Sequence, residues 1–193
     1  KACWLMTYFQ NPLGASMPAE NKQRLVGMLR ERQISLIEDD VYGELYFSAE
    51  RPQPAKALDQ GGQILHCSSF SKCLAPGFRV GWVAAGRYAQ QIQRLQLMST
   101  VSTSVPTQLA IADYLLHGGY DTHLRRLRRL LAQRQSMMRQ AIAHHFPPTV
   151  KVSQPDGGYF LWVELDPALS SMELYQRALA PVSYTHLRAH ETR

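Results

Sequence analysis

"HCSSFSKCLAPGFRVGW", residues 66–82, places a single lysine between two apolar runs. The runs that Lys72 separates, "QILHCSSF" (63–70) and "RVGWVAAG" (79–86), both predict strands. A buried ammonium is costly unless it is paired or used in chemistry. Two interpretations of Lys72 therefore stay open. It is a nucleophile toward a carbonyl, activated because desolvation disfavours its charged form, or an ammonium that reaches solvent along its own stem.

Apolar runs and helical patterns alternate ahead of this stretch. Residues 2–8 and 34–40 predict strands, and residues 18–32 predict a helix between them. Strands that alternate with a helix predict a βαβ arrangement and a sheet that is at least partly parallel. Such sheets carry their chemistry at the carboxyl ends of the strands.

The second half of the chain changes character. Helical patterns cover 87–98, 105–117 and 121–146, and Pro147 and Pro148 end the last of them. "TVKVSQ" and "GYFLWVEL" then predict two strands joined by the turn "PDGG", and "SSMELYQRALA" predicts a helix capped by Ser170 or Ser171. We therefore expect part of a large α/β domain at 1–110, connecting helices at 111–146 and the start of a small α+β domain at 147–181.

The last twelve residues, "VSYTHLRAHETR" (182–193), break this periodicity. They resemble the translation of a sequencing adapter, so we expect an adapter-derived tail and leave it out of the fold. Without it, the formal charge of +6 falls to +5, because the tail holds two arginines and one glutamate.

Polar side chains gather where the predicted strands end. Asn11 follows the first strand, Asp39, Asp40 and Tyr42 follow the second, and Lys72 follows the third. Ends of neighbouring parallel strands lie along one edge of a sheet, so these residues are expected to converge.

The residues around Lys72 suit a phosphate group. Ser69 and Ser71 flank the lysine, and Arg79 follows the turn residues Pro76 and Gly77. Hydroxyls, a guanidinium and turn amides are what a phosphate dianion needs, although the serines can also simply end a strand. The spacing is not that of a Walker loop. A lysine beside a phosphate cradle is one signature of pyridoxal phosphate.

The acidic run "EDDVY" (38–42) fits the same cofactor. A carboxylate beside the pyridine nitrogen keeps that nitrogen protonated. Asp39 and Asp40 alternate across the strand, so one faces the ring and the other is a surface or helix-start acid. Tyr42 and Asn11 can each donate to the phenolic oxygen, although an ordinary Asn-Pro turn also explains Asn11.

"NPLG", "EDDVYGEL" and "SFSKCLAPGFRVGW", in this order, resemble the class I/II aminotransferase domain of the fold-type I pyridoxal-phosphate enzymes, over residues 1–181. The resemblance implies that Lys72 forms the internal aldimine and that Asp39 holds the ring nitrogen. It also implies that Tyr42 and Asn11 contact the phenolic oxygen. The implied phosphate ligands are Ser69, Ser71 and Arg79.

"ACWLMT", "LHCSSFSK" and "HLRRLRRLL" resemble the aminotransferase-like domain of MocR-type regulators, which follows a GntR-like winged helix. A winged helix of this protein would lie upstream of Lys1. The resemblance implies a homodimer and two main functions. One is transamination between an amino acid and a keto acid, and the other is sensing by a DNA-binding regulator with little turnover. Lyase or decarboxylase chemistry is a third, because the substrate-binding arginine and the ring-stacking aromatic are expected outside this chain.

Composition bounds these functions. Hydrophobic residues make up 45% and charged residues 19%, which excludes a disordered chain, and no apolar run is long enough to span a membrane. Cys3, Cys67 and Cys73 form no CxxC pair, so a reduced, cytoplasmic setting is expected. Cys73 lacks an evident base and is expected to be a packing residue.

The basic helix "LRRLRRLLAQR" invites a nucleic-acid interpretation, but a solvated outer face is favoured because aromatic residues are not interleaved with the arginines. Its apolar stripe is predicted to be Leu124, Leu127, Leu130 and Leu131. His144 and His145 suit the negative end of the helix dipole rather than a metal, and no metal site is expected.

Overall fold

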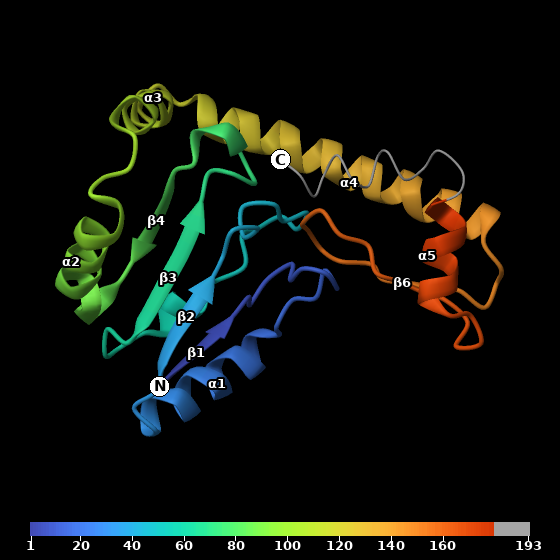
Figure 1. The fold of residues 1–193 in the computed structure, drawn as a ribbon, viewed down its shortest axis with the longest axis horizontal. Coiled ribbons are helices and arrows are strands. Elements are labelled where there is room, and N and C mark those ends of the chain that lie inside the picture. Colours follow the sequence, from blue (N-terminus) through green and yellow to red (C-terminus); the bar gives the residue numbers. More distant parts are fainter. Residues whose placement is uncertain (180–193) are drawn as a thin grey trace.

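The computed structural model describes residues 1–179, except for the side chain of Ser171. The expected adapter-derived tail at 182–193 lies outside the described residues. Figure 1 shows a twisted sheet with helices around it and one long helix that runs away from the sheet. No helix within residues 1–179 has the length and apolar character that a membrane crossing requires.

The sheet has four strands, β1 (Ala2–Leu5), β2 (Ser35–Asp39), β3 (Ile64–Ser69) and β4 (Gly81–Ala84), in that spatial order. β1, β2 and β3 are parallel, and β4 runs antiparallel to β3. The predicted, mainly parallel sheet is therefore confirmed. In the register of β2 and β3, Glu38 lies opposite His66 and Asp39 lies opposite Cys67.

Helix α1 (Ala19–Glu31) and the short 3-10 helix η1 (Ala55–Leu58) cover one face of this sheet. Leu29 of α1 packs there against Leu36, Ala55 and Ile64. Because successive strand residues point to opposite faces, Leu36 and Glu38 face α1, whereas Asp39 faces the other side. The sheet thus presents two chemically different surfaces at the end of β2.

The remaining elements follow the predicted order with shifted bounds. They are η2 (Pro76–Phe78), η3 (Gly86–Tyr88), α2 (Ala89–Thr100), α3 (Val105–Leu116), α4 (Gly119–His145) and α5 (Ser171–Leu179). The long helix ends before the two prolines, as predicted. Ser170 accepts a hydrogen bond from the Glu173 amide at 3.4 Å, which suits the predicted cap.

The predicted strands near the ends of the chain are shorter than expected. The first stops at Leu5 instead of residue 8 because residues 6–9 leave the ladder for a loop. The two strands of the small domain pair only over β5 (Lys151–Val152) and β6 (Val163–Glu164), which are antiparallel. Between them, Gly157 instead bridges to Tyr46.

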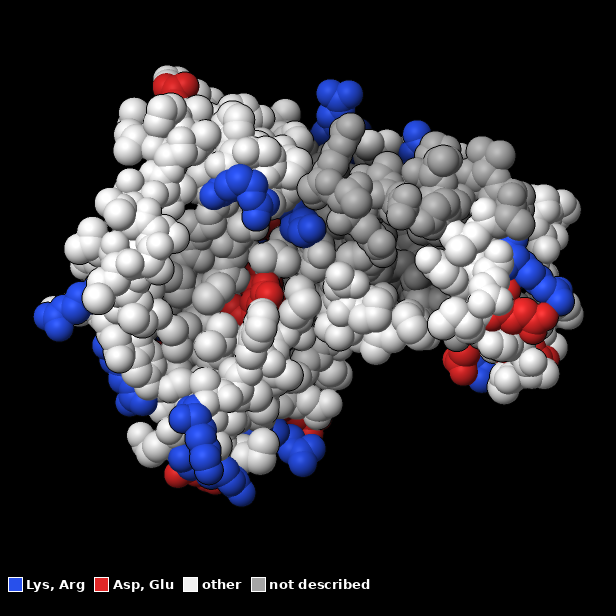
Figure 2. All heavy atoms as spheres, viewed as in Figure 1, with Lys and Arg blue, Asp and Glu red and all other residues white. Residues whose placement is uncertain are grey.

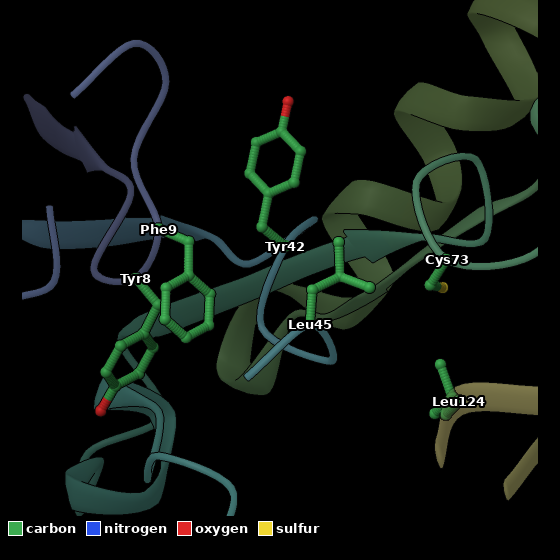
Figure 3. Packing of buried hydrophobic residues seen from close by; sticks show 6 residues of the cluster. All are labelled: Tyr8, Phe9, Tyr42, Leu45, Cys73 and Leu124. Carbon is green, nitrogen blue, oxygen red and sulfur yellow. The ribbon is translucent and has the colours of Figure 1, made fainter. Parts of the chain in front are cut away.

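A second core lies beyond the carboxyl ends of the strands (Figure 3). Its buried members come from the loops after β1, β2 and β3 and from α4: Tyr8, Phe9, Tyr42, Leu45, Cys73 and Leu124. Leu127, Leu131 and Phe160 pack against it, but Leu130 is 46% exposed, so its place in the predicted stripe was wrong. This core fixes the strand-end loops that carry the candidate residues.

Candidate functional site

Asp39 ends β2 on the face away from α1 and is half-buried. Within residues 1–179, its carboxylate accepts a single hydrogen bond, a long one of 3.4 Å from the Val41 amide. It lines a hollow together with Trp4, Gln10, Met17 and their neighbours Leu5, Met6, Ala15 and Ser16. Figure 2 shows acidic side chains at the floor of a hollow near this strand end, with basic side chains at its rim. Asp39 is thus a carboxylate with capacity for a further partner.

Asp40 was expected to be a surface or helix-start acid, and this is wrong. Its side chain is buried, with a residue exposure of 3%, and its Oδ2 pairs with Arg51 at 3.1 Å. The alternation of the strand does send Asp39 and Asp40 to opposite faces. However, the face that receives Asp40 is covered by other parts of the chain rather than by water.

Tyr42 is buried, with 4% exposure, and its ring stands edge-on to Phe160 at 5.4 Å and to Tyr159 at 6.2 Å between centroids. Its hydroxyl points away from Leu45 (Figure 3) and has no hydrogen-bond partner among the described residues. Burial, aided by the negative charge of Asp39, raises the pKa of this phenol. The hydroxyl is therefore a proton donor without an acceptor.

Lys72 lies in the turn after β3 and is exposed. Its Nζ stands 5.9 Å from the ring centroid of Tyr42, so the structure brings these two predicted residues together. The hydroxyl of Tyr159 donates to the backbone oxygen of Lys72. Sequence reasoning missed Tyr159, because only the fold brings residue 159 beside residue 72. The available signal was its place directly after the "DGG" turn.

Arg79 and Ser71 also meet. Arg79 Nη1 donates to Ser71 Oγ at 3.1 Å and to the Pro76 carbonyl at 3.4 Å. Ser69 closes β3 on the same sheet face as Asp39, since it lies two residues after Cys67, the register partner of Asp39. A guanidinium, a hydroxyl and a strand end are thus gathered around the lysine turn, as a bound anion would need.

Asn11 is exposed in the loop between β1 and α1. Its side chain forms no hydrogen bond with the other predicted residues in the part of the chain that the structure describes. Asn11 therefore follows β1 in the chain, but no hydrogen bond within residues 1–179 ties its side chain to the other predicted site residues.

Helix α4 braces the lysine turn. His123 Nε2 bonds to the Cys73 carbonyl at 2.7 Å, and the Cys73 thiol lies 3.2 Å from the Tyr120 hydroxyl. Cys73 is 4% exposed and belongs to the second core, which suits the packing role expected for it. Burial raises the pKa of its thiol, so the residue is a weak nucleophile.

The basic face of α4 is only partly solvated. Arg128 donates from Nε to the Glu44 carbonyl at 2.7 Å and from Nη2 to the Glu44 carboxylate at 3.1 Å. Its guanidinium also lies 3.8 Å from the Tyr46 ring centroid. Arg125, Arg126 and Arg129 are exposed, as expected for an outer face. Arg128 instead anchors the helix to the segment that follows Tyr42.

The model of the family "Aminotransferase class I and II" matches residues 2–190. The uncharacterized HTH-type transcriptional regulator YdcR of Escherichia coli is 58% identical over 93% of this chain and 38% of its own length. Aromatic-amino-acid aminotransferase 1 of Thermococcus litoralis is 30% identical over 93% of this chain and 43% of its own. The chain thus spans less than half of either relative.

Solved structures of aminotransferases have the same fold as this chain. LysN, the α-aminoadipate aminotransferase of Thermus thermophilus complexed with N-(5'-phosphopyridoxyl)-L-leucine, superposes with a TM-score of 0.85 at 33% identity, over 93% of this chain and 47% of LysN. The kynurenine aminotransferase of Pyrococcus horikoshii, in complex with PMP, gives 0.87 at 31% identity, over 93% of this chain and 45% of its own. The predicted fold-type I architecture is confirmed, and so is the resemblance to regulators with aminotransferase-like domains. By its sequence and its fold, this chain belongs to the class I and II aminotransferase family.

Proposed function

We propose that this chain binds pyridoxal phosphate and supports transamination of an amino acid. The observation that carries the proposal is the group of polar side chains at the strand ends, most of which still have hydrogen-bonding capacity for a ligand. Among the described residues, the hydroxyl of the buried Tyr42 has no acceptor, and the Asp39 carboxylate accepts one long hydrogen bond. Arg79 Nη1 lies 3.1 Å from Ser71 Oγ, so a guanidinium and a hydroxyl stand side by side. A ligand with a pyridinium nitrogen, a phenolic oxygen and a phosphate matches this set of donors and acceptors.

Each residue then has a role. Lys72 would hold the cofactor, Asp39 would keep its ring nitrogen protonated, and Tyr42 and Asn11 would donate to its phenolic oxygen. The phosphate would be held by Ser69, Ser71 and Arg79. When bound, pyridoxal phosphate supplies an electron sink for the bonds at the substrate Cα. With its amine free, Lys72 Nζ would take the Cα proton of the bound amino acid as a general base and return a proton as a general acid.

For the whole protein, we propose a division into part of a large domain at 1–110, connecting helices at 111–146 and the start of a small domain at 147–181. We also propose that it acts as a homodimer on amino acids and keto acids. The three cysteines are free, which suits a reduced, cytoplasmic setting. DNA would be a partner only through a winged helix upstream of Lys1.

A second function is favoured by one specific observation. The relative that is 58% identical is an HTH-type regulator, whereas the aminotransferase of Thermococcus litoralis is 30% identical. The same site would then bind pyridoxal phosphate as an effector, and the lysine-bound state would set the affinity of an upstream domain for DNA with little turnover.

The visible absorbance spectrum of the full-length protein tests both functions. Wild type and Lys72→Ala are compared after addition of pyridoxal phosphate, with and without amino acids. Lys151→Ala is the matched control, because Lys151 is an exposed lysine on β5, away from the strand ends. We expect wild type and the control to hold the cofactor after gel filtration, and Lys72→Ala to lose the visible band.

The response to amino acids separates the two functions. Loss of the visible band with release of a keto acid supports transamination. A band that shifts but persists, together with a change in DNA affinity, supports sensing. A wild-type protein that takes up no pyridoxal phosphate contradicts both, and the strand-end residues then need another explanation.

A further inference from the structure

The face of β2 opposite Asp39 carries a second pair of acids. Glu38 lies in β2 and Asp40 follows the strand directly, with its amide still bonded to the Cys67 carbonyl at 2.8 Å, so the two side chains share the face that α1 and η1 cover. Glu38 is 0% exposed and Asp40 is 3% exposed. Two carboxylates in so little water repel each other and lose hydration, so the surroundings must compensate for at least one of them.

Glu38 is fully compensated. It accepts hydrogen bonds from Thr7 Oγ1 at 2.7 Å and from the amides of Ala55 and Lys56 at 2.7 and 3.0 Å. His66 Nδ1 lies 2.9 Å from its Oε2. Although burial alone would raise its pKa, these bonds to the charged form lower the pKa of Glu38 to about 2. Glu38 therefore stays ionised, and it fixes Nδ1 as a protonated nitrogen of His66.

Asp40 is compensated only in part. Arg51 reaches its Oδ2 at 3.1 Å, and His66 Nε2 lies 3.5 Å from the same oxygen. Its other oxygen, Oδ1, is buried without a hydrogen-bond partner among the described residues. Burial raises the pKa of Asp40 to about 6, although His66 and Arg51 oppose this. With Nδ1 facing Glu38, His66 presents its Nε2 to Asp40, and a proton on Asp40 would occupy the buried carboxyl whose Oδ1 has no partner among the described residues.

Asp40 is linked to the turn that carries Tyr42 through both its side chain and its backbone carbonyl. It lies against Gly43, where an added Cβ would come within 2.2 Å of Oδ1. Its carbonyl accepts hydrogen bonds from the Gly43 amide at 3.2 Å and from Ser68 Oγ at 3.0 Å. Asp40 thus stands between Asp39 and Tyr42 and holds the turn that carries Tyr42.

We propose that Asp40 and His66 are positioning residues: Asp40 holds a proton on the α1 face of β2, His66 faces it with Nε2, and together they set the placement of Asp39 and Tyr42 on the cofactor side. The inference rests on the proposed function, because its consequence is that cofactor affinity depends on the protonation of Asp40. The charged or titratable groups that act on Asp40 come from every neighbouring element: Lys22 of α1, Glu38 of β2, His66 of β3, and Glu44 and Arg51 of the segment after β2.

The first test is the pH profile of pyridoxal-phosphate affinity in the full-length protein, between about pH 5 and about pH 8. Asp40→Asn keeps the side-chain volume but holds no exchangeable acid proton. We expect the pyridoxal-phosphate affinity of the wild type to change at least about threefold across a midpoint near pH 6. The affinity of Asp40→Asn should stay constant over the same range. His66→Asn, which can still donate to Glu38 from its amide but lacks Nε2, keeps the Asp40 acid and loses a group that opposes its raised pKa, so its midpoint is expected to move to higher pH. Asp113→Asn is the control, since Asp113 is exposed on α3, and it should keep the wild-type profile.

The second test needs no cofactor. Asp40 binds its proton more tightly in the folded than in the unfolded chain, because its usual pKa of 3.8 rises to about 6. The stability of the wild type should therefore fall as the pH rises from about 4 to about 6 and then level off. In Asp40→Asn the urea midpoint should not fall over this range, whereas Asp113→Asn should behave like the wild type.

The outcomes separate this inference from the proposed function. If the wild type binds pyridoxal phosphate but Asp40→Asn keeps the wild-type midpoint, the positioning role is overturned and the proposed function stands. The same conclusion follows if Asp40→Asn flattens the stability curve while its binding profile keeps the wild-type midpoint. If the wild type binds no pyridoxal phosphate at any pH, both ideas are overturned.

Discussion

At the scale of single residues, the Tyr42 hydroxyl is the sharpest test of the site. Tyr42→Phe keeps the ring that packs against Phe160 and removes only the hydroxyl, which has no partner among the described residues. Stability should therefore change by less than about 0.5 kcal/mol, while pyridoxal-phosphate affinity should fall about tenfold, the worth of one hydrogen bond to a charged group. Fluorescence titration and urea denaturation of the full-length protein measure the two effects.

Tyr175→Phe is the control for this substitution, because Tyr175 lies 51% exposed on α5. It should leave both quantities unchanged. A Tyr42→Phe protein that binds the cofactor as tightly as the wild type would remove Tyr42 from the set of cofactor ligands.

The lowered pKa of Glu38 leads to a prediction of how the free energy of unfolding changes in acid. Its pKa is lowered from 4.5 to about 2 in the folded chain, so its contribution is present above about pH 4.5 and is lost as the pH falls toward 2. A shift of this size corresponds to about 3 kcal/mol. The urea midpoint of wild type, taken relative to Glu38→Gln at the same pH, should therefore be higher at about pH 5 than at about pH 3, because the opposing contribution of Asp40 is present in both proteins. Glu50→Gln, at an exposed acid, should retain the wild-type difference.

At the scale of elements, Arg128 decides how α4 docks. It joins the Glu44 carbonyl and carboxylate and covers the Tyr46 ring, whereas Arg126 on the same helix is exposed. Arg128→Ala should lower the free energy of unfolding by about 1–3 kcal/mol, because the half-buried Glu44 loses one of its two arginine partners and its carbonyl loses a hydrogen bond, while Arg51 remains 3.2 Å from the carboxylate. Arg126→Ala should cost less than about 0.5 kcal/mol. Equal effects of the two substitutions in urea denaturation would contradict the anchoring role.

Elements with a strong local pattern could be predicted from the sequence. The apolar runs of β2 and β3 and the heptad-like leucines of α4 fixed these elements to within about two residues, apart from Leu130. The length of β5 and β6 could not be predicted, because the ladder stops where Gly157 pairs with Tyr46 instead. The partners of Asp40 could not be predicted either, because they too depend on contacts between distant parts of the sequence. Its burial depends on Arg51 and His66, which only the folded chain brings to it.

At the scale of the whole molecule, the segment 156–160 joins the distal part of the chain to the strand ends. The Gly158 amide donates to the Leu45 carbonyl at 2.9 Å, and the Phe47 amide donates to the Asp156 carbonyl at 2.7 Å. Phe160 then packs against Tyr42, and Tyr159 holds the turn of Lys72. The contacts that tie the two parts of the molecule together are therefore the same contacts that shape the candidate site.

Gly157 is the point at which this connection is tightest, and it yields the last prediction. A Cβ at residue 157 would lie 2.5 Å from the Leu45 carbonyl oxygen and 2.5 Å from Cζ of the buried Phe9, so Gly157→Ala forces the segment away from the strand ends. We expect a loss of about 2–3 kcal/mol in the free energy of unfolding, as for overpacked core sites, with weaker pyridoxal-phosphate binding. Gly27→Ala is the matched control. Gly27 lies inside α1 with nothing within 4 Å of an added Cβ, so alanine should stabilise the protein by up to about 1 kcal/mol and leave binding unchanged. If Gly157→Ala were destabilised but bound the cofactor normally, the segment would support the fold without shaping the site.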